Sequence, residues 1–446
     1  MSRKAFVVGC FAVSLCLLLG CGGTPLAVPT LVPTQASAPP SAGPTGGTDE
    51  VRIGVVYPLS GRLQEWGQEA QPFIQIAEAD ANALPEAVAA GVRFRFVVRS
   101  SETTAEGALA AVRDLVENEG IGVTAGLPLS LELNATSAYL TEHQVAAISS
   151  ASTSPSPALR QIDTIFRISP PELYLARTFA GFAIDQGYRR AAVIYRNDEW
   201  GPYYAEEFAA AFRAQGYSTA LVSIEPTHPQ VGDYAAEVAQ LSARVAELGA
   251  DDRTVVLMAV WEGEDLNILH HAAQDPTLSG VRWLSALLYP SLLDGRFGEA
   301  NLPDARDFAL AHQMWGQEFR PPENDLLRRL WAQARSQLGR EPRYEHVFLY
   351  DALQIAARAV LLAGSTDGDA VAAAIPAAAE AYAPATGPIR FDGNGDRASG
   401  NLAYYGLFQG AEGFEYRYYA FYDAAAGRFN VLPQPERREV RFCPEC

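Results

Sequence analysis

The amino-acid sequence predicts an α/β protein built from two doubly wound lobes with parallel sheets. Short apolar runs rich in Val, Ile and Phe begin at Val51, and each precedes a longer segment with helical spacing. The alternation continues for about 230 residues, which is more than one ordinary domain holds. Aromatic alternation near the C-terminus is typical of antiparallel strands that complete the second lobe.

The order of the segments divides the body into two series. In the first, VRIGVVYPL (51–59) precedes a helix expected from about Leu63 to Ala83, VRFRFVVRS (92–100) precedes a second helical segment, and VTAGL, AAISSAS and IFRIS follow. In the second, a helix over 173–186 leads to AAVIYRND, STALVSIEP, TVVLMAV and RWLSALL, and LAYYGLFQ and YRYYAFYDA complete the lobe. No Pro-rich linker separates the series, so we expect several crossovers and a ligand cleft at the carboxyl ends of the strands.

The N-terminal segment has the composition of a signal peptide. Residues 1–21 (MSRKAFVVGCFAVSLCLLLGC) have a basic start and an apolar run too short for a lasting transmembrane helix. Residues 22–50 are rich in Pro, Ala, Thr, Ser and Gly, which is the composition of an extended tether. The folded body is expected to start near Val51, and none of its segments is expected to span a membrane.

Charge and composition exclude several classes of function. Loss of residues 1–20, which carry only Arg3 and Lys4, takes the formal net charge from -18 to -20, so nucleic acid is not an expected partner. Lys4 is the only lysine, so the mature chain lacks a lysine for Schiff-base or phosphate-loop chemistry. The sequence also contains no GxSxG, HExxH or glycine-rich phosphate motif, and we expect neither an enzyme nor a cofactor.

The cysteines have different expected fates. Leu18, Leu19, Gly20 and Cys21 resemble the lipobox of bacterial lipoproteins, in which the cysteine becomes a lipid anchor. Cys443 and Cys446 form a CxxC pair at the C-terminus, which could be a redox motif or half a zinc site. Outside the cytoplasm, a small structural disulfide or two idle thiols is the favoured interpretation.

Seven segments in order resemble the leucine/isoleucine/valine-binding family of type I periplasmic binding proteins. They are IGVVYPLSGRLQEWGQEA, VTAGLPLS, AAISSASTSP, TIFRISPP, AAVIYRNDEWG, VVLMAVWEGED and TGPIRFDGNGD, spread over about Val51 to Leu407. The resemblance implies two Rossmann-like lobes joined by three crossovers. It also implies the solute-binding lipoprotein of an ABC importer, outside the cytoplasm and anchored to the cell membrane or in the periplasm.

The resemblance implies a set of ligand-binding residues. Ser130, Ala151 and Thr153 match positions that hold the solute carboxylate, a role that suits convergent donors at a helix N-terminus. Ordinary helix capping and turn chemistry is the alternative explanation for these residue types. Trp66, Trp200 and Trp261 match aromatic positions of the cleft, although any one of them alone would more often be structural.

One position departs from the family. Where amino-acid binders have an acidic residue for the solute ammonium, this chain has Leu287, or Tyr289 if the alignment slips. Because a buried unpaired ammonium is costly, either another carboxylate such as Glu262 replaces the missing acid or the solute has no free amine. The solute is therefore expected to be an amino acid, an amide or a short-chain acid.

FDGNGD (391–396) is spaced like the first ligands of a calcium loop but lacks the required glycine and glutamate, so we expect no metal. The expected partners are the small solute, ABC permease subunits and, through the lipid, the membrane, with the protein itself a monomer. A ligand-sensing receptor of the same fold is the alternative function. The expected divisions are a signal peptide at 1–21, a tether at 22–50, a first lobe at 51–169 and 315–392, a second lobe at 170–314 and 393–442, and a CxxC tail at 443–446.

Overall fold

A computed structural model describes residues 49–159, 164–198, 200–226, 232–261, 263–287, 302–320, 322–410 and 413–437. The strands are β1 (Asp49–Tyr57), β2 (Val92–Ser100), β3 (Val123–Gly126), β4 (Ala146–Ser149), β5 (Ile165–Arg167), β6 (Arg190–Arg196), β7 (Ser218–Ile224), β8 (Thr254–Ala259), β9 (Arg282–Ser285), β10 (Trp315–Phe319), β11 (Leu402–Gly410), β12 (Gly413–Asp423) and β13 (Arg428–Arg437). The helices are α1 (Gln64–Asn82), α2 (Pro85–Ala90), α3 (Ala105–Arg113), α4 (Ser130–Glu142), α5 (Glu172–Asp185), α6 (Gly201–Ala214), α7 (Ala235–Leu248), α8 (Glu264–Ala273), α10 (Pro303–Ala311), α11 (Asp325–Leu338), α12 (Glu345–Ala363) and α13 (Gly368–Ala381), with short turns η1 (Asp114–Asn118), η2 (Pro157–Leu159) and η3 (Leu278–Gly280).

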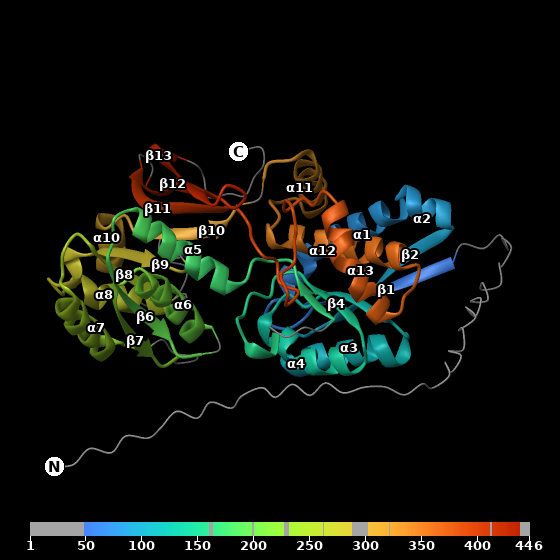
Figure 1. The fold of residues 1–446 in the computed structure, drawn as a ribbon, viewed down its shortest axis with the longest axis horizontal. Helices are drawn as coiled ribbons and strands as arrows, with labels where there is room; N and C mark the ends of the chain where they lie inside the picture. Colours follow the sequence, from blue (N-terminus) through green and yellow to red (C-terminus); the bar gives the residue numbers. More distant parts are fainter. Residues whose placement is uncertain are drawn as a thin grey trace, which may run out of the picture. The chain divides into compact units, whose positions relative to one another are not determined.

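The first sheet has five strands in the order β2-β1-β3-β4-β5, and all neighbours are parallel. Successive side chains of a strand point to opposite faces, so β1 supplies both layers of the core. Val55 packs in the cluster with α1, α12 and α13, whereas Val56 packs in the cluster with α3 and α4. The two groups of helices accordingly lie on opposite sides of the sheet (Figure 1).

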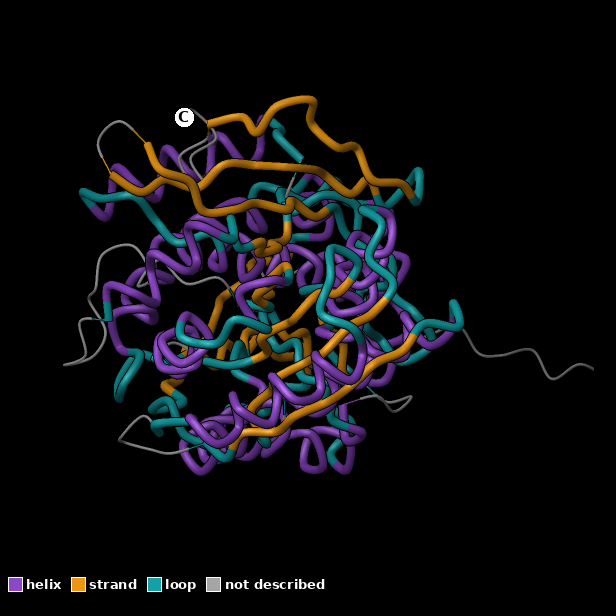
Figure 2. Tube along the Cα trace, turned by 90° about the vertical axis from the view of Figure 1, so that its left-hand side faces the viewer, coloured by secondary structure: helices purple, strands orange, loops and turns teal. Residues whose placement is uncertain are grey.

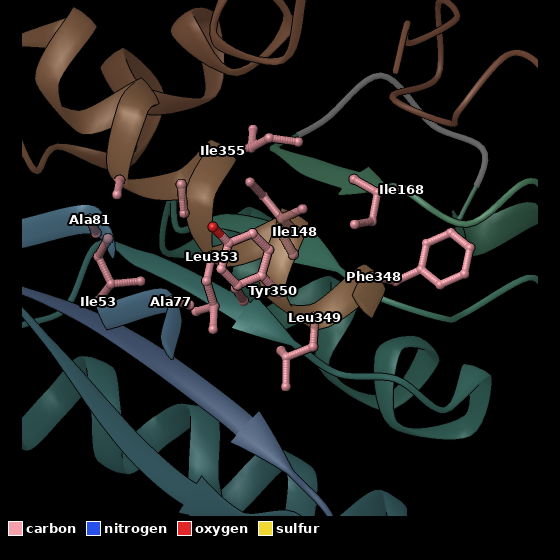
Figure 3. Close-up of a cluster of buried hydrophobic side chains, with 14 of the residues drawn as sticks. Ile53, Ala77, Ala81, Ile148, Ile168, Phe348, Leu349, Tyr350, Leu353 and Ile355 are labelled. Atoms are coloured by element: carbon pink, nitrogen blue, oxygen red, sulfur yellow. The ribbon is translucent and has the colours of Figure 1, made fainter. Parts of the chain in front are cut away.

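The cluster on the α12 side is the larger of these two layers. Figure 3 shows Ile53 and Ile148 of the sheet with Ala77 of α1 and with Leu349 and Leu353 of α12. Helix α12 is long and apolar enough to cross a membrane, and it is alone in this among the described residues. Most of its apolar window is buried inside the protein, which explains its composition as that of a core helix.

The second sheet has eight strands in the order β13-β12-β11-β10-β9-β8-β6-β7. From β7 to β10 all neighbours are parallel, and β10 to β13 pair antiparallel. The aromatic alternation therefore forms antiparallel strands, as predicted, and Figure 2 shows these long strands running side by side. Within β6, Val193 packs with α5 and α6, and Ile194 packs with α7 and α8.

The chain passes between the sheets three times, after β5, after β10 and after α13. Strand β10 pairs with β9 and β11, so residues 315–319 belong to the second sheet and not to the first lobe, where the sequence placed them. A strand of five residues gives little sign of which sheet it joins, because the choice depends on distant partners. Helices α11 to α13, which follow it, pack on the first sheet.

Two buried arginines lie at the connections between the two sheets. Arg167 at the end of β5 donates to both carboxylate oxygens of Asp396, at 2.5 and 2.6 Å. Arg397 donates to the carbonyls of Ile168 and Thr386 at 3.2 and 2.9 Å, and burial lowers the pKa of its guanidinium to about 10. The FDGNGD segment is thus a turn whose last carboxylate pairs with an arginine of the first lobe.

Candidate functional site

The strand order of each sheet defines where a ligand crevice can form. In doubly wound sheets, ligands bind at the carboxyl ends of the strands where the strand order reverses. That point lies between β1 and β3 in the first sheet and between β6 and β8 in the second. Trp66 and Ser130 follow β1 and β3, and Trp200 and Trp261 follow β6 and β8. Four residues predicted from the sequence therefore lie at the two switch points.

Ser130 is the first residue of α4, as the sequence predicted. Its Oγ accepts from the backbone amide of Ser154 and from the hydroxyl of Ser152, both at 3.2 Å. Both bonds use the oxygen as acceptor, so the hydroxyl proton can still donate to an anion. The loops after β3 and β4 are thereby fixed to each other next to a helix N-terminus, which favours negative charge.

Ala151 and Thr153 lie in the loop after β4 and are half-buried. The Thr153 hydroxyl donates to the Glu172 carboxylate at 2.7 Å, and the Glu172 amide donates to the Thr153 carbonyl at 3.0 Å. Glu172 opens α5, which packs on the second sheet, so this pair links the two lobes. Burial raises the pKa of Glu172, although the bond from Thr153 opposes the shift.

Trp66 lies in the first turn of α1 and packs against a buried aromatic group. Its ring centroid is 5.5 Å from that of Tyr57 and 5.8 Å from that of His346. The Tyr57 hydroxyl is hydrogen-bonded to His346 Nδ1 at 3.1 Å, and burial raises the pKa of Tyr57. The half-buried indole of Trp66 thus rests on a polar, fully buried support at the end of β1.

A buried carboxyl group lies beneath the Ser130 loop. Glu132 in the first turn of α4 is 0% exposed, and its Oε1 accepts from the Ser101 hydroxyl at 2.5 Å. Its Oε2 meets no hydrogen-bond partner among the described residues. Burial raises the pKa of Glu132 from 4.5 to about 7, so the carboxyl is easily held in its neutral form.

The second switch point carries the other two tryptophans. Trp200 precedes α6, and its ring centroid lies 5.5 Å from that of Tyr204. Its indole Nε1 is buried near Glu172, but the geometry is not that of a hydrogen bond. Trp261 is 44% exposed, and the Arg196 guanidinium carbon lies 4.2 Å from its ring centroid. The structure thus places the Trp200 indole near Glu172, which is bonded to Thr153, and places the Trp261 ring against Arg196 at the end of β6.

Leu287 is half-buried two residues after β9, and its carbonyl accepts from the Ser285 hydroxyl at 2.9 Å. The alternatives Glu262 and Tyr289, the anchor Cys21 and the pair Cys443 and Cys446 lie outside the described residues. Within the described ranges, no group of three His, Cys, Asp or Glu side chains could hold a metal ion.

Sequence reasoning missed two charged residues of the site, Glu172 and Arg196. Glu172 follows two prolines and starts a helix, where acidic residues are common in any protein. Its position in the sequence therefore gave no sign of a role in ligand binding. Arg196 stands inside a segment that resembles the family. Its partner Glu264 is 68 positions away in the sequence, and no local pattern predicts such a pair.

Two doubly wound sheets joined by three passages of the chain define the type I periplasmic binding protein fold. The sequence model described as "periplasmic binding protein" matches residues 50–411. The chain belongs to this family of proteins.

Several solved structures are similar to this chain. A leucine-binding protein from Thermotoga maritima has a TM-score of 0.61 and 18% identity, and the match covers 83% of this chain and 98% of that one. A substrate-binding protein of an ABC transporter from Desulfitobacterium hafniense, in complex with Leu, has a TM-score of 0.61 and 21% identity over 82% of this chain and 100% of its own. A solute-binding protein from Rhodopseudomonas palustris, in complex with 3,4-dihydroxybenzoic acid, has a TM-score of 0.61 and 17% identity over 84% and 98% of the two chains.

Among curated proteins, an uncharacterized protein from Methanocaldococcus jannaschii is 23% identical over 401 residues, which is 85% of this chain and 91% of that protein.

Proposed function

We propose that this protein is the extracytoplasmic solute-binding component of an ABC importer and captures an amino acid or a related small polar solute between its lobes. One observation supports the proposal above the others. The switch points of both sheets present residue types that suit a small solute: hydroxyls, a helix N-terminus and the Trp66 indole on the first sheet, and the Trp200 and Trp261 indoles on the second. The Thr153–Glu172 pair brings side chains from the two lobes within bonding distance.

The charges of the site support a solute that carries an amine as well as a carboxylate. Leu287 supplies no charge, but Glu172 places a carboxylate beside Thr153 and Trp200. A solute with a carboxylate alone would bring a second anion next to Glu172, and like charges at that distance repel. An ammonium group would instead pair with Glu172. The solute would then need no acidic residue at the position of Leu287.

Binding then proceeds by an exchange of hydrogen bonds. The Thr153 hydroxyl has one proton, and in this structure it is donated to Glu172. When the solute ammonium takes over the Glu172 carboxylate, the hydroxyl is free to rotate and donate to the solute carboxylate. The Ser130 hydroxyl and the N-terminus of α4 add further donors, and Trp200 and Trp261 cover the apolar part of the solute.

The test is a binding panel on the mature protein, read by intrinsic tryptophan fluorescence. It contains amino acids, their amides and the deaminated acids of the same carbon skeleton. We expect an amino acid to bind at least about ten-fold more tightly than its deaminated partner, as one desolvated charge pair allows. A protein that binds no member of the panel, or converts one into product, would contradict the proposal.

A matched pair of variants isolates the role of Glu172. Glu172→Gln keeps the size and the contact with Thr153 but removes the charge, so the preference for the amine should fall to about three-fold or less. Glu207→Gln, on the solvent side of α6 in an exposed ion pair with Arg177, is the control and should leave the preference unchanged. An unchanged preference in Glu172→Gln would remove this residue from the ammonium site.

We also propose that Cys21 carries a lipid and tethers the protein to the outer face of the membrane, where it delivers the solute to a permease. The proposal is supported by the apolar run that precedes Cys21 and by the Pro-rich segment that follows it. Cys21→Ser should release the protein from the membrane fraction, and mass spectrometry should find a diacyl group on Cys21 of the natural chain. An unmodified cysteine would contradict this part of the account.

A further inference from the structure

The two tryptophan loops of the second lobe are both tied to one arginine. Arg196 is the last residue of β6, and its guanidinium bonds two carboxylates, Asp198 Oδ2 at 2.5 Å and Glu264 Oε1 at 2.7 Å. The second oxygen of each carboxylate accepts from a loop backbone. Asp198 Oδ1 accepts from the Trp200 amide, and Glu264 Oε2 accepts from the Trp261 amide, both at 2.9 Å.

The guanidinium also contacts one indole directly. Its central carbon lies 4.2 Å from the centroid of the Trp261 ring, which is within the range of a cation–π interaction. The contact restrains an indole that is 44% exposed. Arg196 thus contacts the loop after β6 through Asp198 and contacts the loop after β8 through both Glu264 and the Trp261 ring.

Burial makes these contacts stronger than ordinary surface ion pairs. The side chains of Arg196 and Glu264 are 12% and 5% exposed, and that of Asp198 is 21% exposed. A planar guanidinium can present separate N–H groups to two carboxylates and a face to an aromatic ring at the same time, and a lysine ammonium cannot. The arrangement uses all three capacities of the arginine.

We propose that Arg196 is a positioning residue that holds Trp200 and Trp261 in one fixed arrangement and so determines which solute shapes the second lobe accepts. The proposal rests on the proposed function, since it assigns these indoles to the solute site. Side chains held in place by a second layer of bonds bind tightly, because less freedom is lost when the ligand arrives.

The first test needs no solute. The protein is labelled with 5-fluorotryptophan, and the resonances of its six tryptophans are recorded by 19F NMR and assigned with Trp200→Phe and Trp261→Phe. Arg196→Met should shift both resonances, whereas Asp198→Asn should move that of Trp200 and Glu264→Gln that of Trp261. The amide variants keep the size of the side chains and carry the test alone if Arg196→Met folds poorly.

Arg190→Met is the matched control. Arg190 lies at the amino end of the same strand and pairs with Asp251 and Thr254, away from both tryptophan loops. It should leave the two resonances in place. Resonances of Trp200 and Trp261 that stay unchanged in Arg196→Met and in both amide variants would overturn the proposal, even if the natural protein binds solutes as proposed.

The second test uses a solute that binds the natural protein in the panel. Arg196→Met should weaken its binding by about ten-fold, and Arg196→Lys, which keeps the charge without the planar fork, should recover only part of that loss. The ratio of affinities for branched and unbranched solutes should also shrink in both variants. An equal loss for every solute, with the ratio retained, would overturn the specificity role. Failure of the natural protein to bind any solute would instead reject the proposed function. The resonance test would still decide whether Arg196 holds Trp200 and Trp261 in place.

Discussion

The parallel strands of the two sheets follow the same order, but the loops at their carboxyl ends are joined by different kinds of contact. Around β3 and β4 the loops are joined by neutral serine contacts, in which Ser130 accepts from Ser152 and Ser154. Around β6 and β8 the loops are joined by ion pairs and a cation–π contact centred on Arg196. The loops after β3 and β4 thus form a first wall of small donors, beside which Trp66 adds one indole, and the loops after β6 and β8 form a second wall that carries Trp200 and Trp261.

In the proposed site, the difference follows from what each wall would hold. Small hydroxyls and a helix N-terminus satisfy an anion from close range, and they need little support because their side chains are short. An indole is large and turns about its side-chain bonds, so fixing it requires contacts to its loop and to its face. The buried charges of the second lobe supply those contacts.

The largest effect should appear away from both walls, at the Arg167–Asp396 pair, where the returning chain lies beside β5. Arg167→Met removes the arginine that bonds both oxygens of the buried Asp396 carboxylate, and loss of one partner of such a pair costs about 3–5 kcal/mol of unfolding free energy. Urea unfolding monitored by circular dichroism measures it. The control Arg177→Met removes an exposed ion pair and should cost no more than about 1 kcal/mol. Equal losses in the two variants would show that the buried pair contributes no more than the exposed one.

The unfolding free energy should depend on pH through Glu132, which lies beneath the first wall. The folded protein binds the Glu132 proton more tightly than the unfolded chain, because burial raises the pKa of this residue from 4.5 to about 7. Its contribution to the unfolding free energy is retained below pH 4.5 and is lost as the pH rises from 4.5 through about 7. Relative to the natural protein, Glu132→Gln should gain about 2–3 kcal/mol between pH 5 and pH 8.

Urea unfolding at the two pH values measures this gain. Glu142→Gln, an exposed glutamate at the end of the same helix, is the control and should show no such change. If the difference between Glu132→Gln and the natural protein is the same at pH 5 and pH 8, the buried carboxyl does not titrate in this range.

The smallest effect concerns a single hydroxyl of the first wall. Thr153→Ala should weaken solute binding by at least about 1 kcal/mol, as expected for a hydrogen bond to a charged group. Thr141→Ala, on an exposed part of α4, is the control for a lost threonine hydroxyl and should bind normally. Isothermal titration calorimetry compares the two, and an unchanged affinity in Thr153→Ala would exclude that hydroxyl from the solute site.

Much of this architecture could be predicted from the sequence, because local patterns determine it. Alternation of apolar runs and helical spacing predicted the two sheets, and a serine after the VTAGL strand predicted the start of α4 at Ser130. The aromatic alternation after residue 400 likewise predicted antiparallel strands.

Features that depend on distant residues could not be predicted in this way. The membership of β10 in the second sheet depends on β9 and on β11, about 85 residues further along the chain than β10. The Arg196 network joins residues 68 positions apart, and the Thr153–Glu172 pair depends on how the chain leaves the first lobe. Glu132 resembles an ordinary first-turn glutamate until its burial is known.

In the proposed site, the two carboxyl edges form the two walls around one solute. Hydrogen–deuterium exchange of the mature protein, with and without the solute that binds most tightly in the panel, would show whether both edges contact it. The solute should slow exchange in the loops after β3 and β4 and also in the loops after β6 and β8. Slower exchange in the loops of one lobe alone, or in neither, would contradict a site shared by the two lobes.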